Sequence, residues 1–325
     1  MSAAVTMPDL RLLVVRLGAM GDVLHVLPAV ASLRASHPAA RITWAIEPQW
    51  APLLEGNPHI DRLLPVRRGS LARLLGTLRE LRSESYDYAV DFQGLLKSAL
   101  VAKAASPGRL FGFDRYQVRE LVATLFHSDS VHSEAIHRVD QCLDLAAAVP
   151  GTSIRVREFP LPEGSPDGEL PPGDFVLASP LAGWQGKQWP LEFYGALAAR
   201  LQRELGLPLV CNVPSTGSLP AIEGVGIHVS SLAGLIWATR RATAVVGVDS
   251  GPMHLAAALV KPGVAIFGPT DPARNGPYHA PSLRVLRDPG ARTTYKRGDT
   301  INGSMRRILP DQVFEALREA LRFVA

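Results

Sequence analysis

Short apolar runs alternate with longer amphipathic stretches along the first half of the chain. The apolar runs have the length of buried strands, and the stretches between them repeat apolar positions with helical spacing. Strands are predicted at residues 12–15, 42–46, 62–66, 88–92 and 110–113. Helices are predicted at residues 23–35, 70–81, 95–104, 118–126 and 135–148. Strands separated by helices favour a parallel sheet with helices on both faces.

The same alternation returns in the second half. Strands are predicted at residues 175–179, 208–213, 227–229, 244–248 and 264–267, and helices at residues 191–205, 232–241, 253–260 and 311–323. Between the halves, residues 150–173 are rich in proline, glycine and charge and lack helical periodicity, which is typical of a linker. We therefore expect an α/β protein of two Rossmann-like domains, residues 1–160 and 161–310, whose sheets face each other across a ligand cleft.

Composition narrows the partners that such a protein would bind. The chain has 325 residues, of which 34 are basic and 30 acidic. This balance is only mildly basic and does not indicate nucleic acid. The basic residues cluster in the first half, which fits an anionic small substrate or an anionic membrane surface. Cys142 and Cys211 lie far apart without metal-ligand spacing, so neither a metal site nor a disulfide is expected.

Location is predicted from what the sequence does not contain. Its first residues lack a charged region followed by an apolar core, so no signal peptide is expected. No apolar run approaches the roughly 20 residues needed to span a bilayer. We expect a cytoplasmic protein, with peripheral contact to the cytoplasmic face of the inner membrane as a further expectation.

A glycine loop with an acid follows the first predicted strand. Residues 16–25 read RLGAMGDVLH, and Gly21 is followed directly by Asp22. An acid here would repel the diphosphate that a dinucleotide-binding loop holds, but it suits a base that takes a proton from a hydroxyl. The alternative is an ordinary helix N-cap, for which Asp is a preferred residue. Pro28 predicts a short distorted turn near Asp22 and a regular helix from Pro28 onward.

Two loops in the second half have the chemistry to bind phosphate. In residues 179–190, Lys187 precedes a predicted helix, where its charge and the helix N-terminus could neutralise a diphosphate. In residues 246–254, Ser250 and Gly251 open a helix, with Asp249 free to accept sugar hydroxyls. The alternatives are a surface lysine, an N-cap at Asp249 or Ser250, and a packed His254.

Five segments together resemble a known family. They are RLGAMGDVLHVLP, DFQGLLKSA, KQWP, VDSGPMHLAAAL and FGPTDP. In this order they are similar to the ADP-heptose:lipopolysaccharide heptosyltransferases of glycosyltransferase family 9, most closely to those of the heptosyltransferase I type. The resemblance runs over about residues 11–320. It implies the GT-B fold and inverting heptose transfer from ADP-heptose to the Kdo of a lipid-linked saccharide, without a metal ion or other cofactor.

The resemblance also implies roles for individual residues. Asp22 matches the general base, and Lys187 matches a catalytic lysine at the donor phosphates. The donor side matches Gly183, Lys187, Asp249, Ser250, Gly251 and His254. The acceptor side matches Gly21, Arg67, Arg68, Lys97, Arg119 and Arg138. A C-terminal helix within residues 311–325 is expected to cross back to the first domain, as it does in family members.

Two departures from the family pattern concern nucleotide recognition. Ala182 and Gly183 stand where relatives carry hydroxyl side chains, and no acid occurs between residues 214 and 220, so that Glu223 is the first acid available for the ribose. Two other functions stay open, and the departures favour the second of them. One is a nicotinamide-dependent oxidoreductase with Glu47 at a ribose, although the first loop is not Gly-x-Gly-x-x-Gly. The other is a nucleotide-sugar-binding protein without catalysis.

Overall fold

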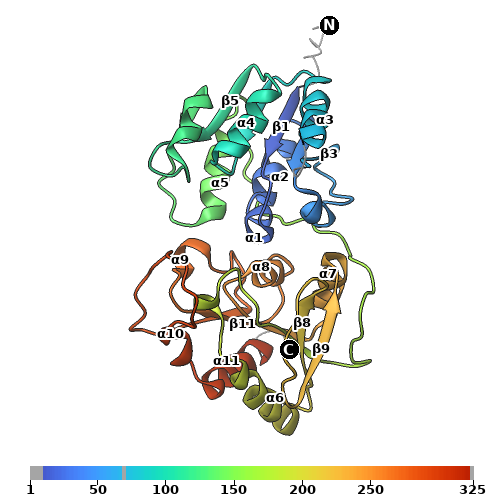
Figure 1. The fold of residues 1–325 in the computed structure, drawn as a ribbon, viewed down its shortest axis with the longest axis vertical. Helices are drawn as coiled ribbons and strands as arrows, with labels where there is room; N and C mark the ends of the chain where they lie inside the picture. The colour runs from blue at the N-terminus through green and yellow to red at the C-terminus, as the bar shows by residue number, and fades with distance from the viewer. Residues whose placement is uncertain (1–9, 68–70, 323–325) are drawn as a thin grey trace, which may run out of the picture. The chain divides into compact units, whose positions relative to one another are not determined.

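The chain folds into two compact units, residues Met1–Pro162 and Glu163–Ala325, called here the first unit and the second unit. The computed structural model describes residues 10–67 and 71–322. Each unit is an α/β layer structure built around a parallel sheet, and each is described by itself (Figure 1).

The sheet of the first unit has six parallel strands in the order β3-β2-β1-β4-β5-β6. They are β1 (Arg11–Val15), β2 (Arg41–Ile46), β3 (Arg62–Pro65), β4 (Tyr88–Asp91), β5 (Arg109–Phe113) and β6 (Asp129–Val131). Val15 pairs with Ala45 of β2 and with Asp91 of β4. The three central strands therefore end at nearly the same height in the sheet, and the loops that follow them lie at one edge of the sheet.

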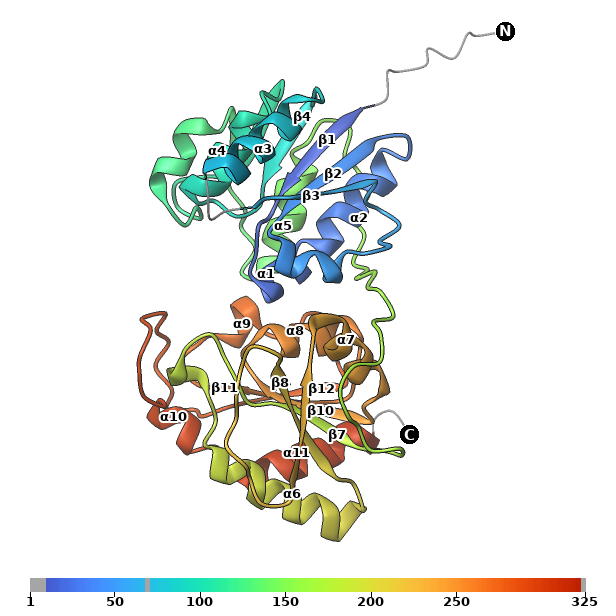
Figure 2. The same cartoon turned by 45° about the vertical axis from the view of Figure 1, so that its right-hand side comes forward.

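Helices cover both faces of this sheet. They are α1 (Met20–Leu24), α2 (Leu27–Ser36), α3 (Leu71–Arg82), α4 (Leu96–Ala104) and α5 (Arg138–Ala147), with 3-10 segments η1 (Pro48–Leu53) and η2 (Leu121–Phe126). α2 packs with α5, whereas α3 packs with α4 (Figure 2). Leu13 and Val15 share a core with Leu81 and Ala102, so the α3–α4 pair covers the sheet face that these strand residues line.

The second unit repeats the architecture with strand order β12-β11-β10-β7-β8-β9. The strands are β7 (Val176–Ser179), β8 (Leu209–Pro214), β9 (Val225–Ser230), β10 (Ala244–Val248), β11 (Gly263–Phe267) and β12 (Leu283–Arg287). All neighbouring pairs run parallel. Gly247 of β10 pairs with Ser179 and Ala265, so the loops after β7, β10 and β11 meet at one edge.

Helices also pack against the second sheet. The helical segments are α6 (Leu191–Leu205), α7 (Leu232–Arg241), α8 (Gly251–Ala258), α9 (Pro272–Asn275), α10 (Gly303–Arg306), α11 (Pro310–Arg322) and the 3-10 turn η3 (Gln185–Lys187). α11 packs against α6 and β11, burying Phe314 and Leu317 against Val246. The structure thus places within the second unit the helix that was expected to cross back to the first domain.

The α/β class and the alternation of elements are confirmed, with a few local differences. Pro28 lies in the first turn of α2, after the short α1, as predicted. The helix predicted at residues 118–126 is wrong, because only residues 121–126 form a 3-10 segment. The short edge strands β6 and β12 were not predicted. Their three and five residues carry too little hydrophobic periodicity to stand out in the sequence.

Candidate active site

The first loop at the carboxyl edge of the first sheet is held tightly. The indole N–H of Trp44 donates to the Arg16 carbonyl at 3.1 Å, and the backbone N–H of Leu17 donates to the Gln93 side-chain oxygen at 2.8 Å. A Cβ added at Gly18 would lie 2.5 Å from the Trp50 ring nitrogen. The tryptophan ring occupies the space of a side chain there, so a larger residue at position 18 would force that ring to move.

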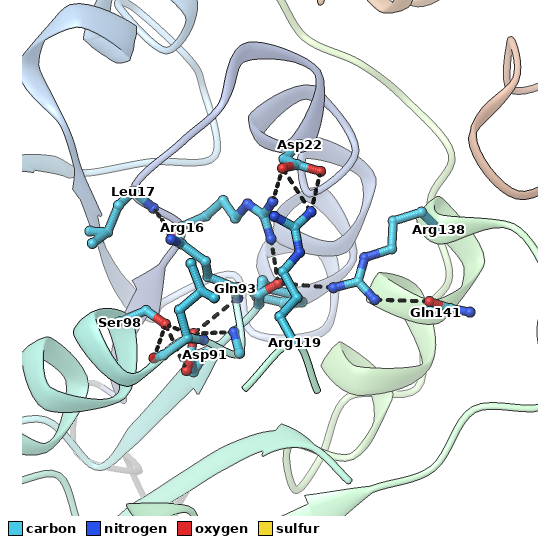
Figure 3. Close-up of polar contacts among 12 residues, drawn as sticks. Arg16, Leu17, Asp22, Asp91, Gln93, Ser98, Arg119, Arg138 and Gln141 are labelled. Carbon is cyan, nitrogen blue, oxygen red and sulfur yellow. Dashed lines mark hydrogen bonds and ion pairs between the residues drawn. The ribbon is translucent and has the colours of Figure 1, made fainter. Parts of the chain in front are cut away.

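Asp22 ends up between two arginines rather than at a helix cap. The N-cap of α1 is Ala19, which places Asp22 inside the first turn, so the N-cap interpretation is wrong. The Asp22 carboxylate forms an ion pair with buried Arg16 and a second one with Arg119 at 3.0 Å. Figure 3 shows both guanidinium groups facing this carboxylate. The Asp22 side chain keeps 22% of its surface exposed, so it is partly accessible to a ligand.

The two arginines determine the ionisation of Asp22. Burial by itself would raise the pKa of Asp22, but the charges of Arg16 and Arg119 outweigh burial and hold that pKa well below its usual range. Burial lowers the pKa of Arg16, and the neighbouring Asp22 charge opposes this effect. The carboxylate is therefore charged at any physiological pH, as a proton acceptor must be, but it is a weak base while both arginines contact it.

A buried hydrogen-bond network fixes the arginine beneath Asp22. Arg16 donates to the Phe92 carbonyl at 2.7 Å, and Arg138 donates to the same oxygen at 3.4 Å. The loop that carries this carbonyl is held by Asp91, which accepts from the backbone N–H of Gln93 at 2.9 Å and from the Ser98 hydroxyl at 3.0 Å (Figure 3). Arg16 is thus a fixed element of the site.

The predicted acceptor-side residues divide into those at Asp22 and those elsewhere. Arg119 contacts Asp22 directly, and Gly21 precedes it in α1. Arg138 is buried, with its guanidinium bonded to Gln141 at 2.9 Å and stacked on the Phe113 ring at 4.4 Å.

Two of the remaining acceptor-side predictions, Lys97 and Arg67, lie on other parts of the sheet edge. Lys97 forms an ion pair with Glu47 at 3.5 Å. Glu47 is the acid that the oxidoreductase alternative would place at a ribose, and in the structure it pairs with this lysine instead. Arg67 is exposed just after β3. Arg68 lies outside the described residues. Among the predicted acceptor-side cations that the structure describes, Arg119 and Arg138 are therefore the ones brought to the Asp22 network.

The second unit holds a compact charged cluster at the equivalent edge. Lys187 forms an ion pair with Asp249 at 2.9 Å, and the His254 ring nitrogen lies 3.6 Å from the other Asp249 oxygen. Asp249 is 5% exposed, so the expectation that it is free to accept sugar hydroxyls is wrong for this conformation. Burial would raise the pKa of Asp249, but the His254 hydrogen bond and the Lys187 charge keep it well below its usual range.

The start of α8 leaves one polar group unsatisfied. Ser250 is the N-cap residue, but its side chain makes no capping bond. Its hydroxyl is buried and has no hydrogen-bond partner within the described part of the chain. An unpaired buried hydroxyl is costly, so a ligand oxygen that pairs with it gains free energy. Gly251 begins the helix itself, whose first N–H groups favour an anion.

The loop after β7 combines an open glycine with the cationic side chain. Nothing lies within 4 Å of a Cβ built on Gly183, which is exposed. Lys187 ends the 3-10 turn and lies 5.7 Å from the centre of the Trp184 ring. The loop therefore presents open backbone at Gly183, whereas Lys187 is fixed by two neighbours.

Glu223 does not reach this edge. It precedes β9 by two residues, and Val225 at the start of β9 pairs with Leu209 at the start of β8. In a parallel sheet this is the edge opposite the carboxyl ends. Glu223 is therefore wrongly placed for a ribose held next to Ser250, and the loop directly after β8 offers only hydroxyls: Ser215, Thr216 and Ser218.

Three structural features concern metals, cysteines and membranes. Within residues 10–67 and 71–322, no group of three or more His, Cys, Asp or Glu side chains is placed to hold a metal ion. Cys142 and Cys211 are free thiols in the cores of different units, and burial raises the pKa of Cys211 to about 12. None of the helices in these ranges is both long and apolar enough to cross a membrane.

Two Rossmann-like units with charged loops at the carboxyl ends of their parallel sheets form the GT-B fold, and a solved structure agrees. The fold matches E. coli heptosyltransferase WaaC with ADP at a TM-score of 0.77 and 25% identity, covering 96% of this chain and all of that chain. The sequence profile of glycosyltransferase family 9 (heptosyltransferase) matches residues 75–217 and 229–303. The chain belongs to this family and is a glycosyltransferase.

Curated relatives agree with the family assignment. The chain is 29% identical over 307 residues to lipopolysaccharide heptosyltransferase 1 of Pseudomonas aeruginosa, covering 83% of this chain and 81% of the relative. It is 28% identical over 294 residues to the Escherichia coli protein of the same name, covering 83% and 91%. Family membership contradicts the oxidoreductase alternative and favours a transferase over a binding protein.

Sequence reasoning missed the residue that most influences Asp22. Arg16 follows directly after β1, six residues before Asp22, and the motif that begins with it gave it no role of its own. A charged residue ending an apolar strand is a usable signal, because burying an arginine requires a partner. Gln93 and Asp91 gave no such signal, since their roles depend on contacts between separate loops.

Proposed function

We propose that this chain transfers heptose from ADP-heptose to a Kdo sugar of the lipopolysaccharide inner core, with inversion at the anomeric carbon and without a metal ion. The names of the relatives support the sugar and the acceptor class, and the ADP in the E. coli structure supports the nucleotide. The observation that carries the proposal is the partly exposed Asp22 carboxylate at the sheet edge, which caps no helix.

On this proposal the second unit binds the donor. The diphosphate lies against the start of α8, where the Ser250 hydroxyl and the backbone of Gly251 bind its oxygens. Lys187 supplies a positive charge, and Asp249 with His254 orients that lysine. Gly183 offers close backbone approach. A diphosphate is a weakly basic leaving group, so it needs charge stabilisation more than a proton.

The first unit binds the acceptor and supplies the base. The acceptor hydroxyl oxygen bonds to the anomeric carbon as the bond from that carbon to the diphosphate oxygen breaks. Asp22 takes the hydroxyl proton, and ADP leaves from the opposite face, which inverts the configuration. The acidic groups of the acceptor contact basic residues predicted for the acceptor side, with Arg119 beside Asp22 and with Lys97 and Arg67 elsewhere on this edge.

Arg119 resolves the weakness of Asp22 as a base. Its side chain is 45% exposed, whereas Arg16 is buried, so Arg119 is the arginine that can turn toward a bound carboxylate or phosphate. When Arg119 contacts the acceptor instead of Asp22, one of the charges that lower the pKa of Asp22 is lost. The acceptor would thus strengthen the base that deprotonates it.

The test is the Asp22→Asn variant, assayed separately for transfer and for ADP binding. A general base contributes about 10² to 10⁴ in rate, so heptose transfer should fall by that factor while ADP affinity stays within about twofold. Retained ADP binding also shows that the second unit is folded.

Asp129→Asn is the matched control, because Asp129 also pairs with an arginine, Arg109, and is similarly exposed. It should transfer at the wild-type rate. Wild-type turnover in Asp22→Asn would remove Asp22 as the base and would contradict the proposed mechanism.

A further inference from the structure

Exposed aliphatic side chains gather on one segment of the first unit. Leu121 is 65% exposed and Leu125 is 80% exposed, both in η2, and Val122 beside them is 42% exposed. Leu100 on α4 is 48% exposed. These four residues are called here the η2 patch. Large exposed apolar side chains at successive positions of one short segment are unusual on a folded domain and typical of an interaction surface.

The patch is held in place from below. η2 packs against α4, with Ala123 fully buried and Phe126 against the core of the first unit (Figures 1 and 2, green segment after β5). The Glu120 carboxylate accepts from the backbone N–H of Leu96 at 2.7 Å, one helical turn before Leu100. The leucines therefore point outward from an anchored segment, rather than being exposed by fraying of a loose end.

Basic residues outnumber acidic ones in the segments that carry the patch. Residues 96–126, which contain α4 and η2, include five basic and two acidic side chains, and three of the basic ones, Lys97, Arg109 and Arg119, form ion pairs with acids elsewhere in the unit. One of the two acids, Glu120, is used by the Leu96 N–H, and the other, Asp114, lies 2.9 Å from a His132 ring nitrogen. Lys103 and Arg115 are exposed. Exposed leucines next to basic residues are suited to a bilayer surface, where the leucines can enter the apolar interior and the basic residues can attract anionic head groups.

We propose that the η2 patch docks the first unit on a bilayer that contains anionic phospholipid, with Leu121 and Leu125 entering the acyl boundary. The proposal rests on the proposed function in one respect, because a lipid-linked acceptor lies in such a bilayer. Lys103 and Arg115 contribute attraction to the head groups. Three of its four side chains lie on one short segment rather than on a broad face, which suits insertion into lipid better than a protein interface of roughly 800 Å² per partner.

Co-sedimentation of the full chain with lipid vesicles tests this. The vesicles are phosphatidylethanolamine with phosphatidylglycerol, compared with phosphatidylcholine alone. The wild-type chain should bind the anionic vesicles and release them as salt is added. Leu121→Ser combined with Leu125→Ser should lower the partition coefficient about tenfold or more, because each buried methylene group contributes to binding. Both side chains are mostly exposed, so folding should be unaffected, as thermal unfolding will check.

Two further variants separate the contributions. Leu309→Ser replaces an equally apolar, 52% exposed leucine of the second unit and should bind vesicles as the wild type does. Lys103→Gln combined with Arg115→Gln should weaken binding and flatten its salt dependence. Transfer to a detergent-dispersed acceptor should be unchanged in the double leucine variant, whereas transfer to a vesicle-embedded acceptor should fall.

Several outcomes would overturn the docking surface. The first is that the wild-type chain binds neither kind of vesicle. The second is that the double leucine variant binds vesicles as well as Leu309→Ser does. The third is that the wild-type chain binds no vesicles but forms a dimer in ultracentrifugation, and that the double leucine variant does not form this dimer. A chain that binds anionic vesicles through the patch but transfers no heptose supports the docking surface and contradicts the proposed function instead.

Discussion

The two units each hold a carboxylate among cations at the same edge of the same kind of sheet, but in different ways. Asp22 of the first unit lies between one buried and one half-exposed arginine and stays 22% exposed. Asp249 of the second unit is buried against Lys187 and His254. The pKa of both acids is held well below its usual range. The two carboxylates therefore share a lowered pKa and differ in accessibility, which is the difference that the proposed roles require: a base at Asp22 and a positioning residue at Asp249.

The same contrast appears between the two arginines at Asp22. Arg16 is fixed by the Phe92 carbonyl, and Arg119 is bound to Asp22 from the solvent side. A buried cation is a permanent part of the fold, whereas an exposed one is free to exchange partners with a ligand. The following variants test this division, from the largest expected effect to the smallest.

Replacing Arg16 should cost far more stability than replacing Arg119. Arg16→Met leaves Asp22 without its buried partner, and breaking a buried ion pair costs about 3–5 kcal/mol. Arg119→Met removes a half-exposed pair and should cost less than about 1 kcal/mol. Urea unfolding of both variants measures the difference. Equal losses would show that Arg119 is as structural as Arg16, and would remove it as the mobile partner of Asp22.

Replacing Lys187 should weaken donor binding and slow transfer together. Lys187→Ala removes the cation proposed to act on the departing diphosphate, and losing one such electrostatic group typically costs about 10² to 10³ in rate. Steady-state transfer kinetics and ADP titration measure both effects. Lys261→Ala is the control, because this lysine of the same unit donates to the Arg240 carbonyl, away from the donor loop. If both variants behave alike, Lys187 has no role at the donor.

Two serines at helix N-caps should respond in opposite ways. The Ser250 hydroxyl is buried without a partner, so Ser250→Ala should leave stability unchanged or slightly higher while ADP affinity falls about fivefold to tenfold. Ser231 does cap its helix, accepting from the Gly234 N–H at 3.2 Å. Ser231→Ala should cost about 1 kcal/mol and leave ADP affinity unchanged. Thermal unfolding and ADP titration decide, and a destabilised Ser250→Ala that keeps full affinity would contradict the donor assignment.

Acid should destabilise both units through these carboxylates. In the unfolded chain an Asp titrates near pH 3.9, and the folded pKa of Asp22 and of Asp249 lies lower. The folded state therefore binds fewer protons in that interval, so their stabilisation is complete above about pH 4 and is lost as the pH falls further. Urea unfolding between pH 3 and pH 7 should show a shallower acid slope in Asp249→Asn than in Asp129→Asn. Identical slopes would contradict the lowered pKa.

Much of the fold was predictable because its signals are local. Every central strand and both helices α6 and α7 follow from apolar runs, amphipathic stretches and the glycines or prolines that end them. The helix predicted over residues 118–126 is wrong, because the structure has only a 3-10 segment from Leu121 to Phe126. In this segment Ala123 and Phe126 pack toward the core, whereas Leu121 and Leu125 are exposed. The sequence pattern shows that all four side chains are apolar, but it does not show which of them are buried.

The sequence by itself determined the α/β class, the family and the loops that carry the charged residues, because strand periodicity and motif order are written in neighbouring residues. Only the tertiary structure decided that Asp22 pairs with Arg16 and Arg119, that Asp249 is occupied by Lys187, and that Glu223 lies at the wrong edge. These relations join residues distant in sequence. They depend on strand order and burial, which set the distance between charges and the water available to screen them.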